Sequence, residues 1–314
     1  MNIYRRAIRF FLTVVLIAFA AIGTAVIFMT RRVLSPPRVP IWGDPGDIGI
    51  PFESITFPAA VDSVRINGWF VPAPAENRNG ATVLIVHGWP WNRLGSGDEG
   101  VLGDMLDLIQ IDLLPLIQSF HQQGYNVSTI DLRNHGESAQ TGGISGGLFE
   151  ARDVLGAINT LSHHQEVDSE KIGVMGFSMG ANSTLFALPQ TDKIKAFVAV
   201  QPTTPNHFGN RLSHYLLGPL GKPVFWLTKQ VIDWIGEIQP FSVDPMDVAP
   251  DVGQVPILYL QSAGDRWGSV ENVTEIAAAT PGTVDTIIYA EGRNRDAGYK
   301  YAVDHPEIAI SFFK

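Results

Sequence analysis

The residues best suited to chemistry form a Gly-x-Ser-x-Gly pattern at positions 176–180, with Ser178 at its centre. An apolar run from 171 to 175, typical of a buried parallel strand, precedes the pattern, and residues 181–188 favour a helix. This order predicts a strand-to-helix turn so sharp that it exposes the serine hydroxyl as a nucleophile. The start of the helix would favour a developing anion there. A plain Gly/Ser loop is the alternative.

A second motif, at residues 87–90, follows an apolar stretch at 81–86 that predicts a central strand. Open α/β sheets build their sites at the carboxyl ends of such strands. The backbone N–H of Trp89 is placed to form half of an oxyanion hole, because Pro90 has no N–H to donate. The N–H of Met179, next to the nucleophile, would supply the other half. In isolation, the motif is equally compatible with a Gly/Pro turn.

Composition excludes several other classes of function. The 314 residues carry a net charge of −9 without a basic block in the body of the chain, which argues against a nucleic-acid partner. Cysteine is absent, so disulfides, a Cys nucleophile and thiolate metal sites are excluded. The eight histidines show no metal-ligand spacing, and the pair His163-His164 is interpreted as solvated surface. We therefore expect no metal and no cofactor.

The N-terminal residues 1–32 are expected to form a membrane anchor with basic flanks. Residues 10–30 are uncharged and as a helix would span about 31 Å, enough to cross a bilayer. A cleaved signal peptide is the alternative, with Ala18-Phe19-Ala20 as a cleavage site, but cleavage there leaves apolar residues 22–29 behind. The slight excess of arginine before the span favours a single-pass protein whose body is extracytoplasmic.

The rest of the chain divides into a Pro/Gly-rich linker at 33–51 and one domain at 52–314. Alternation of strands and helices predicts an α/β fold with a doubly wound, mainly parallel sheet. Residues 202–250 interrupt the alternation and predict an inserted cap, which packs on the sheet, lines an acyl pocket, or does both. The strands are expected at 54–57, 64–66, 68–71, 81–86, 126–132, 171–175, 195–200, 255–260 and 286–290, and helices at 105–117, 149–161, 181–188, 271–279 and 303–313. An entrance flap is the alternative for the first of these helices.

Together these motifs resemble the α/β-hydrolase superfamily, most of all membrane-anchored bacterial serine hydrolases of the esterase and S33/S9 peptidase-like kinds. The resemblance covers about residues 52–314. It implies a catalytic triad in the chain order Ser, Asp, His, with Ser178 as nucleophile and Asp265 as the acid. The motifs that carry it are His87-Gly88-Trp89-Pro90, residues 131–138 (DLRNHGES), the Ser178 pattern and Gly264-Asp265.

The histidine of the triad is missing from the place that the resemblance implies. The loop after the last expected strand, 291–296, has Arg293 or Asn294 there, and neither side chain acts as a base. His305 is the one histidine after Asp265, and it is our candidate base although we expect it on the first turn of the closing helix, beside Asp304. By the same resemblance, His87 and Gly88 support the oxyanion loop, and His135 its own turn.

Two functions follow from different classes of protein. The first is a membrane-tethered serine hydrolase that cleaves a small-molecule carboxylic ester, or less readily a peptide, through Ser178, Asp265 and His305. The second is a non-catalytic α/β-hydrolase-fold protein that binds a ligand at the membrane, because Arg293 or Asn294 replaces the base.

Overall fold

The computed structural model describes residues 2–97, 109–236, 238–289 and 294–314, and their strands form one eight-stranded sheet. The strand order is β1-β2-β4-β3-β5-β6-β7-β8. Strand β2 pairs antiparallel with β1 and β4, and the other pairs are parallel. This arrangement confirms the predicted doubly wound, mainly parallel sheet. The strands are β1 Glu53–Pro58, β2 Arg65–Val71, β3 Thr82–Val86, β4 Asn126–Asp131, β5 Ile172–Phe177, β6 Ile194–Val200, β7 Ile257–Ser262 and β8 Thr283–Tyr289.

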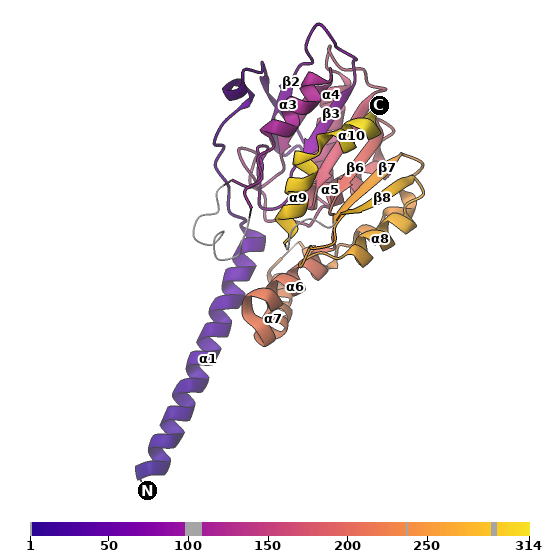
Figure 1. Ribbon diagram of the computed structural model, residues 1–314. Coiled ribbons are helices and arrows are strands. Elements are labelled where there is room, and N and C mark those ends of the chain that lie inside the picture. The colour runs from indigo at the N-terminus through magenta and orange to yellow at the C-terminus, as the bar shows by residue number, and fades with distance from the viewer. Residues whose placement is uncertain (1, 98–108, 237, 290–293) are drawn as a thin grey trace.

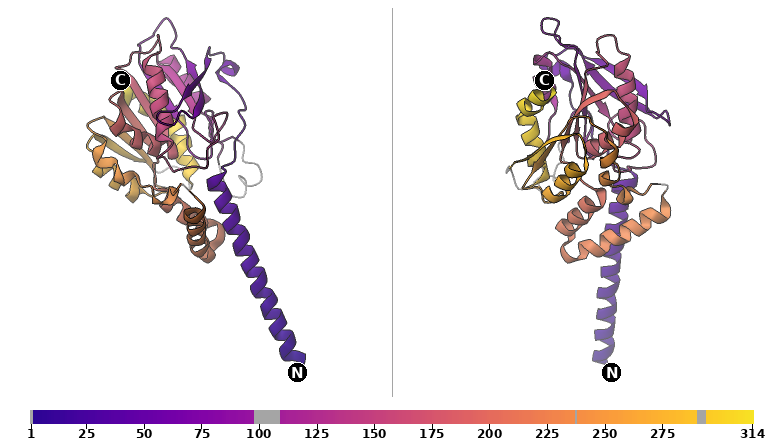
Figure 2. Two further views of the ribbon diagram at one scale, coloured as in Figure 1. Left: turned by 180° about the vertical axis from the view of Figure 1, so that it is seen from behind. Right: turned by 90° about the vertical axis from the view of Figure 1, so that its right-hand side faces the viewer.

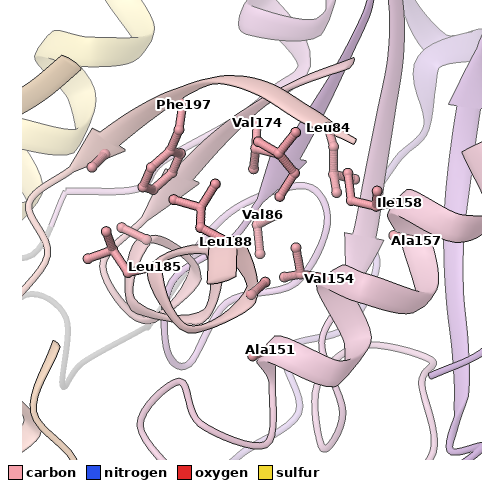
Figure 3. Packing of buried hydrophobic residues seen from close by; sticks show 14 of the residues in the cluster. Leu84, Val86, Ala151, Val154, Ala157, Ile158, Val174, Leu185, Leu188 and Phe197 are labelled. Atoms are coloured by element: carbon pink, nitrogen blue, oxygen red, sulfur yellow. The ribbon is translucent and has the colours of Figure 1, made fainter. Parts of the chain in front are cut away.

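Helices cover both faces of the sheet, as Figure 1 shows. On one face lie α4 Ala151–Ser162, α5 Met179–Ala187 and α8 Val270–Ala279, and on the other α3 Leu114–Gln122, α9 Arg295–Asp304 and α10 Pro306–Phe313. Figure 3 shows Val154 of α4 and Leu185 of α5 packed against Leu84 and Val174 of the sheet. All four side chains are fully buried, so burial on both faces explains why these strands are apolar throughout.

The register of the central strands places the expected site at one edge of the sheet. Strand β3 lies between β4 and β5, and Val86 pairs with Gly176 and with Ile130. Because these strands are parallel, the residues that follow them emerge side by side at the carboxyl edge. His87 and Ser178 therefore lie close together although 91 positions of sequence separate them.

Two parts of the molecule lie outside the sheet and its covering helices. Helix α1, Asn2–Leu34, projects away from the body with the N-terminus at its far end (Figures 1 and 2). Its residues 3–34 are long and apolar enough to cross a membrane, and an 18-residue stretch within them has a mean hydropathy of 2.6. Between β6 and β7 lies a cap with helices α6 Pro205–Leu217 and α7 Gly221–Ile235, beside the end of α1 that joins the body.

Three expected elements differ from the structure. The two strands expected at 64–66 and 68–71 form one strand, β2, which begins at Arg65 and continues through Gly68, where a Cβ would overlap the Thr129 carbonyl oxygen of β4. Of the helix expected at 105–117, residues 105–108 lie outside the described residues, and helix α3 begins only at Leu114. The closing segment forms two helices, because Pro306 disfavours helical backbone at the preceding residue, His305, whose φ and ψ are −117° and 58°.

Candidate active site

Ser178 connects β5 to α5 in a strained backbone conformation, with φ 51° and ψ −112°. The turn is closed by glycines on both sides. A Cβ at Gly176 would lie 2.8 Å from the Ala181 backbone, and a Cβ at Gly180 would overlap the Val86 carbonyl oxygen. Non-glycine residues rarely adopt such positive φ values except where the surrounding structure enforces them. The turn leaves Ser178 half-buried, on the wall of a cavity.

The two amides expected to form the oxyanion hole belong to residues on the same cavity wall as Ser178. Met179 is the first residue of α5, so its N–H has no acceptor within the helix. Trp89 belongs to the loop after β3 and is followed by a cis peptide bond to Pro90. Because Gly88 has no side chain, this loop packs closely on the elbow, and a Cβ at Gly88 would lie 3.2 Å from the Ser178 Cβ.

His87 ties the oxyanion loop to the neighbouring strand. Its Nε2 accepts a hydrogen bond from the Leu132 N–H at 3.0 Å, so Nδ1 carries the proton and donates to the Gly88 carbonyl at 2.7 Å. Burial, and to a lesser extent the neighbouring His135, lowers the pKa of His87 well below its usual value. The imidazole of His135 is also buried and lies 2.8 Å from the Arg133 carbonyl oxygen. The positions of both histidines fit the supporting roles implied by the resemblance.

Asp265 follows β7 and is held by four hydrogen bonds. Its Oδ1 accepts from the N–H groups of Trp267 and Gly268 at 3.0 and 2.8 Å. Its Oδ2 accepts from Gln261 Nε2 at 3.3 Å and from Nη1 of Arg295. The side chain of Asp265 is fully buried. The structure thus brings Asp265 into the site of Ser178, and Arg295 connects the two side chains by donating a hydrogen bond to each.

Arg295 occupies the space between Asp265 and Ser178 where a triad places its histidine. Its side chain is 2% exposed, and its Nη2 donates to Ser178 Oγ at 3.2 Å and to the Gln201 carbonyl. Its Nε donates to the hydroxyl of Tyr299. Burial alone would lower the pKa of Arg295, but the charge of Asp265 and the contacts with Tyr299 leave that pKa raised. A guanidinium with a raised pKa stays protonated, so Arg295 is no base.

The structure does not bring His305 to this site, so the expected triad is corrected here. Helix α9 spans ten residues, about 15 Å at 1.5 Å per residue, with Arg295 at its first position and His305 just after its last. The imidazole of His305 is 45% exposed, lies 3.0 Å from Glu307 and stacks on Tyr301. His305 is therefore not on the first turn of the closing helix but takes the N-cap position of α10, after Asp304 at the end of α9.

Sequence reasoning missed the roles of Arg295 and Tyr299. Asn294 is the N-cap of α9, where its side chain accepts from the Ala297 N–H at 2.9 Å. An N-cap at Asn294 starts a helix whose first and fifth residues, Arg295 and Tyr299, share one face. The sequence thus held a signal for Arg295 and Tyr299, the N-cap residue Asn294. Arg293, the other residue considered for the position of the base, lies outside the described residues. Burial raises the pKa of Tyr299, whose hydroxyl accepts a hydrogen bond from Arg295 Nε.

The cavity at Ser178 has a volume of about 240 Å³ and a mostly apolar wall. Three parts of the chain build it: the carboxyl edge of the sheet, the cap and the C-terminal end of α1. Among its lining residues are Phe28, Met29, Arg32 and Val33 from α1, Leu212, Leu216, Phe225 and Thr228 from the cap, and Trp89, Ser178, Met179, Arg295 and Tyr299 from the site. Within the described residues, no group of three or more His, Asp or Glu side chains is arranged to hold a metal ion.

Comparisons with known proteins agree with this topology. A family model described as the alpha/beta hydrolase fold matches residues 81–220. The chain is 28% identical over 228 residues to the uncharacterized protein YfhR of Escherichia coli O157:H7, covering 72% of this chain and 68% of that protein.

Two solved structures extend the likeness. The Pyrococcus furiosus esterase Pf2001 matches with a TM-score of 0.66 and 21% identity, covering 89% of this chain and 97% of the esterase. The Pyrococcus horikoshii acylaminoacyl peptidase matches with a TM-score of 0.59 and 20% identity, covering 84% of this chain and 41% of the peptidase. At these identities the likeness shows the fold.

Proposed function

We propose that this chain, which has the alpha/beta hydrolase fold, is a membrane-tethered hydrolase of small-molecule carboxylic esters with Ser178 as its nucleophile. The fold and its esterase and peptidase neighbours support hydrolase activity. The observation that carries the proposal is the strained elbow, which holds the Ser178 hydroxyl at an apolar cavity beside the residues whose amides form the oxyanion hole. No feature of the cavity favours a peptide over an ester.

In this proposal Ser178 Oγ attacks the ester carbonyl, and the N–H groups of Trp89 and Met179 stabilise the oxyanion. The alcohol leaves, and water then hydrolyses the acyl-serine to release the acid. The described residues offer no imidazole to accept the Ser178 proton. Water must accept it, because burial keeps the Tyr299 hydroxyl protonated. We therefore expect turnover about 10²–10⁴-fold below that of a site with a histidine base.

The second candidate is a non-catalytic protein that binds its ligand in the same cavity. The observation that favours it is Arg295, which pairs with Asp265 and donates to the nucleophile's oxygen. A hydroxyl that accepts a hydrogen bond from a cation is a weaker nucleophile than one that donates to a base. Fold alone does not decide between binding and catalysis.

The proposed tether is α1, retained in the mature protein. One face of the helix near its C-terminal end is buried against the cap, with Val26 and Thr30 at 8% and 7% exposure and Met29 close to Ser213 and Thr228. A signal peptide is removed after export, and its removal would uncover the cap surface and open the wall of the cavity. We place the body of the protein outside the cytoplasm, on the arginine asymmetry alone.

The two candidates are separated by a fluorophosphonate probe, which reacts covalently with activated serines. The proposed hydrolase labels slowly, and Ser178→Ala abolishes the labelling. The exposed Ser54→Ala in β1 is the matched control and labels like the wild type. A folded wild type that stays unlabelled at every pH up to 10 contradicts catalysis and supports the binding protein.

A further inference from the structure

Large apolar side chains are exposed on the cap at a high density. Outside α1, fourteen large apolar residues among those described are exposed, and eight of them lie between 215 and 235. The most exposed of these eight residues are Trp234 at 85%, Trp226 at 60%, Leu220 at 56% and Ile235 at 55%. A concentrated exposed apolar surface marks a contact with another molecule or a membrane, unlike single exposed residues.

The position of this surface next to α1 identifies what covers it. Met29 of α1 contacts the cap, with its sulfur 3.8 Å from Ser213 Oγ and 4.0 Å from Thr228 Oγ1. Met29 is one residue before the end of the uncharged stretch 10–30, so the cap meets α1 where a spanning helix leaves the hydrocarbon. Figures 1 and 2 both show α7 beside this end of α1. Tryptophan is the residue enriched at that depth of a bilayer.

The polar residues of α7 fit the same depth. Gln230 and Asp233 are exposed between the two tryptophans, and Lys222 is exposed one turn before the first of them. A helix embedded in hydrocarbon would be apolar all round, whereas a helix in the headgroup region carries both kinds of side chain. The cap therefore suits the surface of a bilayer rather than its interior.

On the side opposite Ser178, the wall of the cavity is formed by α1 and the cap helix α6. Phe28, Met29 and Val33 of α1 line it together with Leu212 and Leu216 of α6. Leu216 is also 43% exposed, so one side chain belongs both to the cavity wall and to the exposed cap surface. The route from the nucleophile to the outside of the protein thus reaches the place where α1 meets the cap.

We propose that the cap surface 215–235 lies in the membrane interface and that the cavity takes the acyl chain of a membrane lipid, which enters between α1 and the cap. The substrate class is then a long-chain lipid ester rather than a water-soluble one; cleavage of that ester rests on the proposed function, whereas lipid binding does not. The acyl chain then passes from the hydrocarbon of the bilayer into an apolar cavity, so it is not exposed to water on the way. The ester at its head would meet Ser178 and the oxyanion amides.

The depth of the cap is tested with the full-length protein in phosphatidylcholine vesicles whose acyl chains are brominated near the headgroup. Residues 1–34 contain no tryptophan, so quenching of tryptophan fluorescence reports on the body alone. We expect clear quenching in the wild type, and weaker quenching in the double variant Trp226→Phe/Trp234→Phe, in which Trp89 and Trp267 of the cavity wall remain. Trp42→Phe, which removes an exposed tryptophan outside the cap, is the control and leaves the quenching in place. Unquenched wild-type tryptophans overturn the placement of the cap.

Occupancy of the cavity is tested with a phosphatidylcholine that carries a photoreactive diazirine on its acyl chain. We expect crosslinks to the cavity-lining peptides that contain Met179 and Thr203, reduced at least tenfold in Leu212→Trp, which fills the cavity. Leu148→Trp, on an exposed side chain that does not line the cavity, is the matched control. Unchanged crosslinking in a folded Leu212→Trp variant, or crosslinks confined to the membrane-spanning α1, overturns the proposal.

The same experiment with Ser178→Ala separates the two proposals. This variant removes the hydroxyl but leaves the cavity wall intact, so we expect lipid crosslinking at the wild-type level. If the wild type binds lipid but never reacts with the fluorophosphonate, the hydrolase proposal fails and the lipid site stands. If the wild type reacts with the probe but takes up no lipid, the lipid site fails and the hydrolase proposal stands.

Discussion

The two halves of the site are held in place by different kinds of constraint. In the elbow half, Ser178 and the residues of the oxyanion hole are positioned by backbone contacts, in which Gly88, Gly176 and Gly180 leave no room for a side chain. In the acid half, one buried ion pair between Asp265 and Arg295 decides the chemistry. The comparison teaches that the nucleophile's geometry belongs to the fold, whereas the base is a single side chain that is replaceable without disturbing the fold.

The sharpest way to break this comparison is to restore a base with Arg295→His. If the elbow half is intact, an imidazole between Asp265 and Ser178 raises the hydrolysis of a p-nitrophenyl ester about 10²–10⁴-fold. Arg295→Gln, which removes the charge without adding a base, is the matched control and gains no such activity. A folded Arg295→His variant as slow as the wild type means that the elbow half is not competent.

The ion pair itself is tested for stability with Arg295→Met. Asp265 is fully buried, so loss of its partner leaves an uncompensated carboxylate and lowers the free energy of unfolding by about 3–5 kcal/mol. The double variant Arg295→Met/Asp265→Leu removes both charges and is expected to recover most of that loss. Urea unfolding in detergent measures both; a single variant as stable as the wild type contradicts a structural role for the pair.

The backbone constraint of the elbow half is tested with Gly180→Ala. The added Cβ overlaps the Val86 carbonyl oxygen, and overpacking of this kind costs about 1–3 kcal/mol. Gly142→Ala is the control, because the nearest atom to its added Cβ lies 3.8 Å away. Thermal unfolding compares the two, and equal midpoints would show that the elbow tolerates a side chain.

A smaller effect is expected from an ion pair outside the site. Burial alone would raise the pKa of Asp62, but hydrogen bonds from Arg133 and Arg152 lower it to about 2. A lowered pKa in the folded state stabilises the protein above the unfolded pKa of about 3.9, and this contribution is lost as pH falls towards 2. The side chain of Asp62 is 25% exposed, so we expect only about 0.5–1 kcal/mol. Asp62→Asn should remove that part of the acid dependence, as urea titrations at pH 5 and pH 3 would show.

Much of this protein was predictable from its sequence because the controlling constraints are local. Apolar runs bounded by glycine and proline identify the buried strands, and Gly-x-Ser-x-Gly identifies the elbow, since each glycine is required by atoms of the same turn or the adjoining strand. The place of Asp265 was implied by its motif after a strand, which the structure describes as β7. The long uncharged stretch 10–30 likewise identified α1.

Tertiary structure decided the rest. Which side chain stands beside Ser178 depends on the path of the loop before α9, and Arg295 reaches the nucleophile across 117 positions of sequence while His305 is carried to the far end of the helix. The packing of α1 on the cap likewise joins residues almost 200 positions apart. Periodicity and spacing report on contacts within an element or its nearest turn, so only the folded chain determines pairings at such distances.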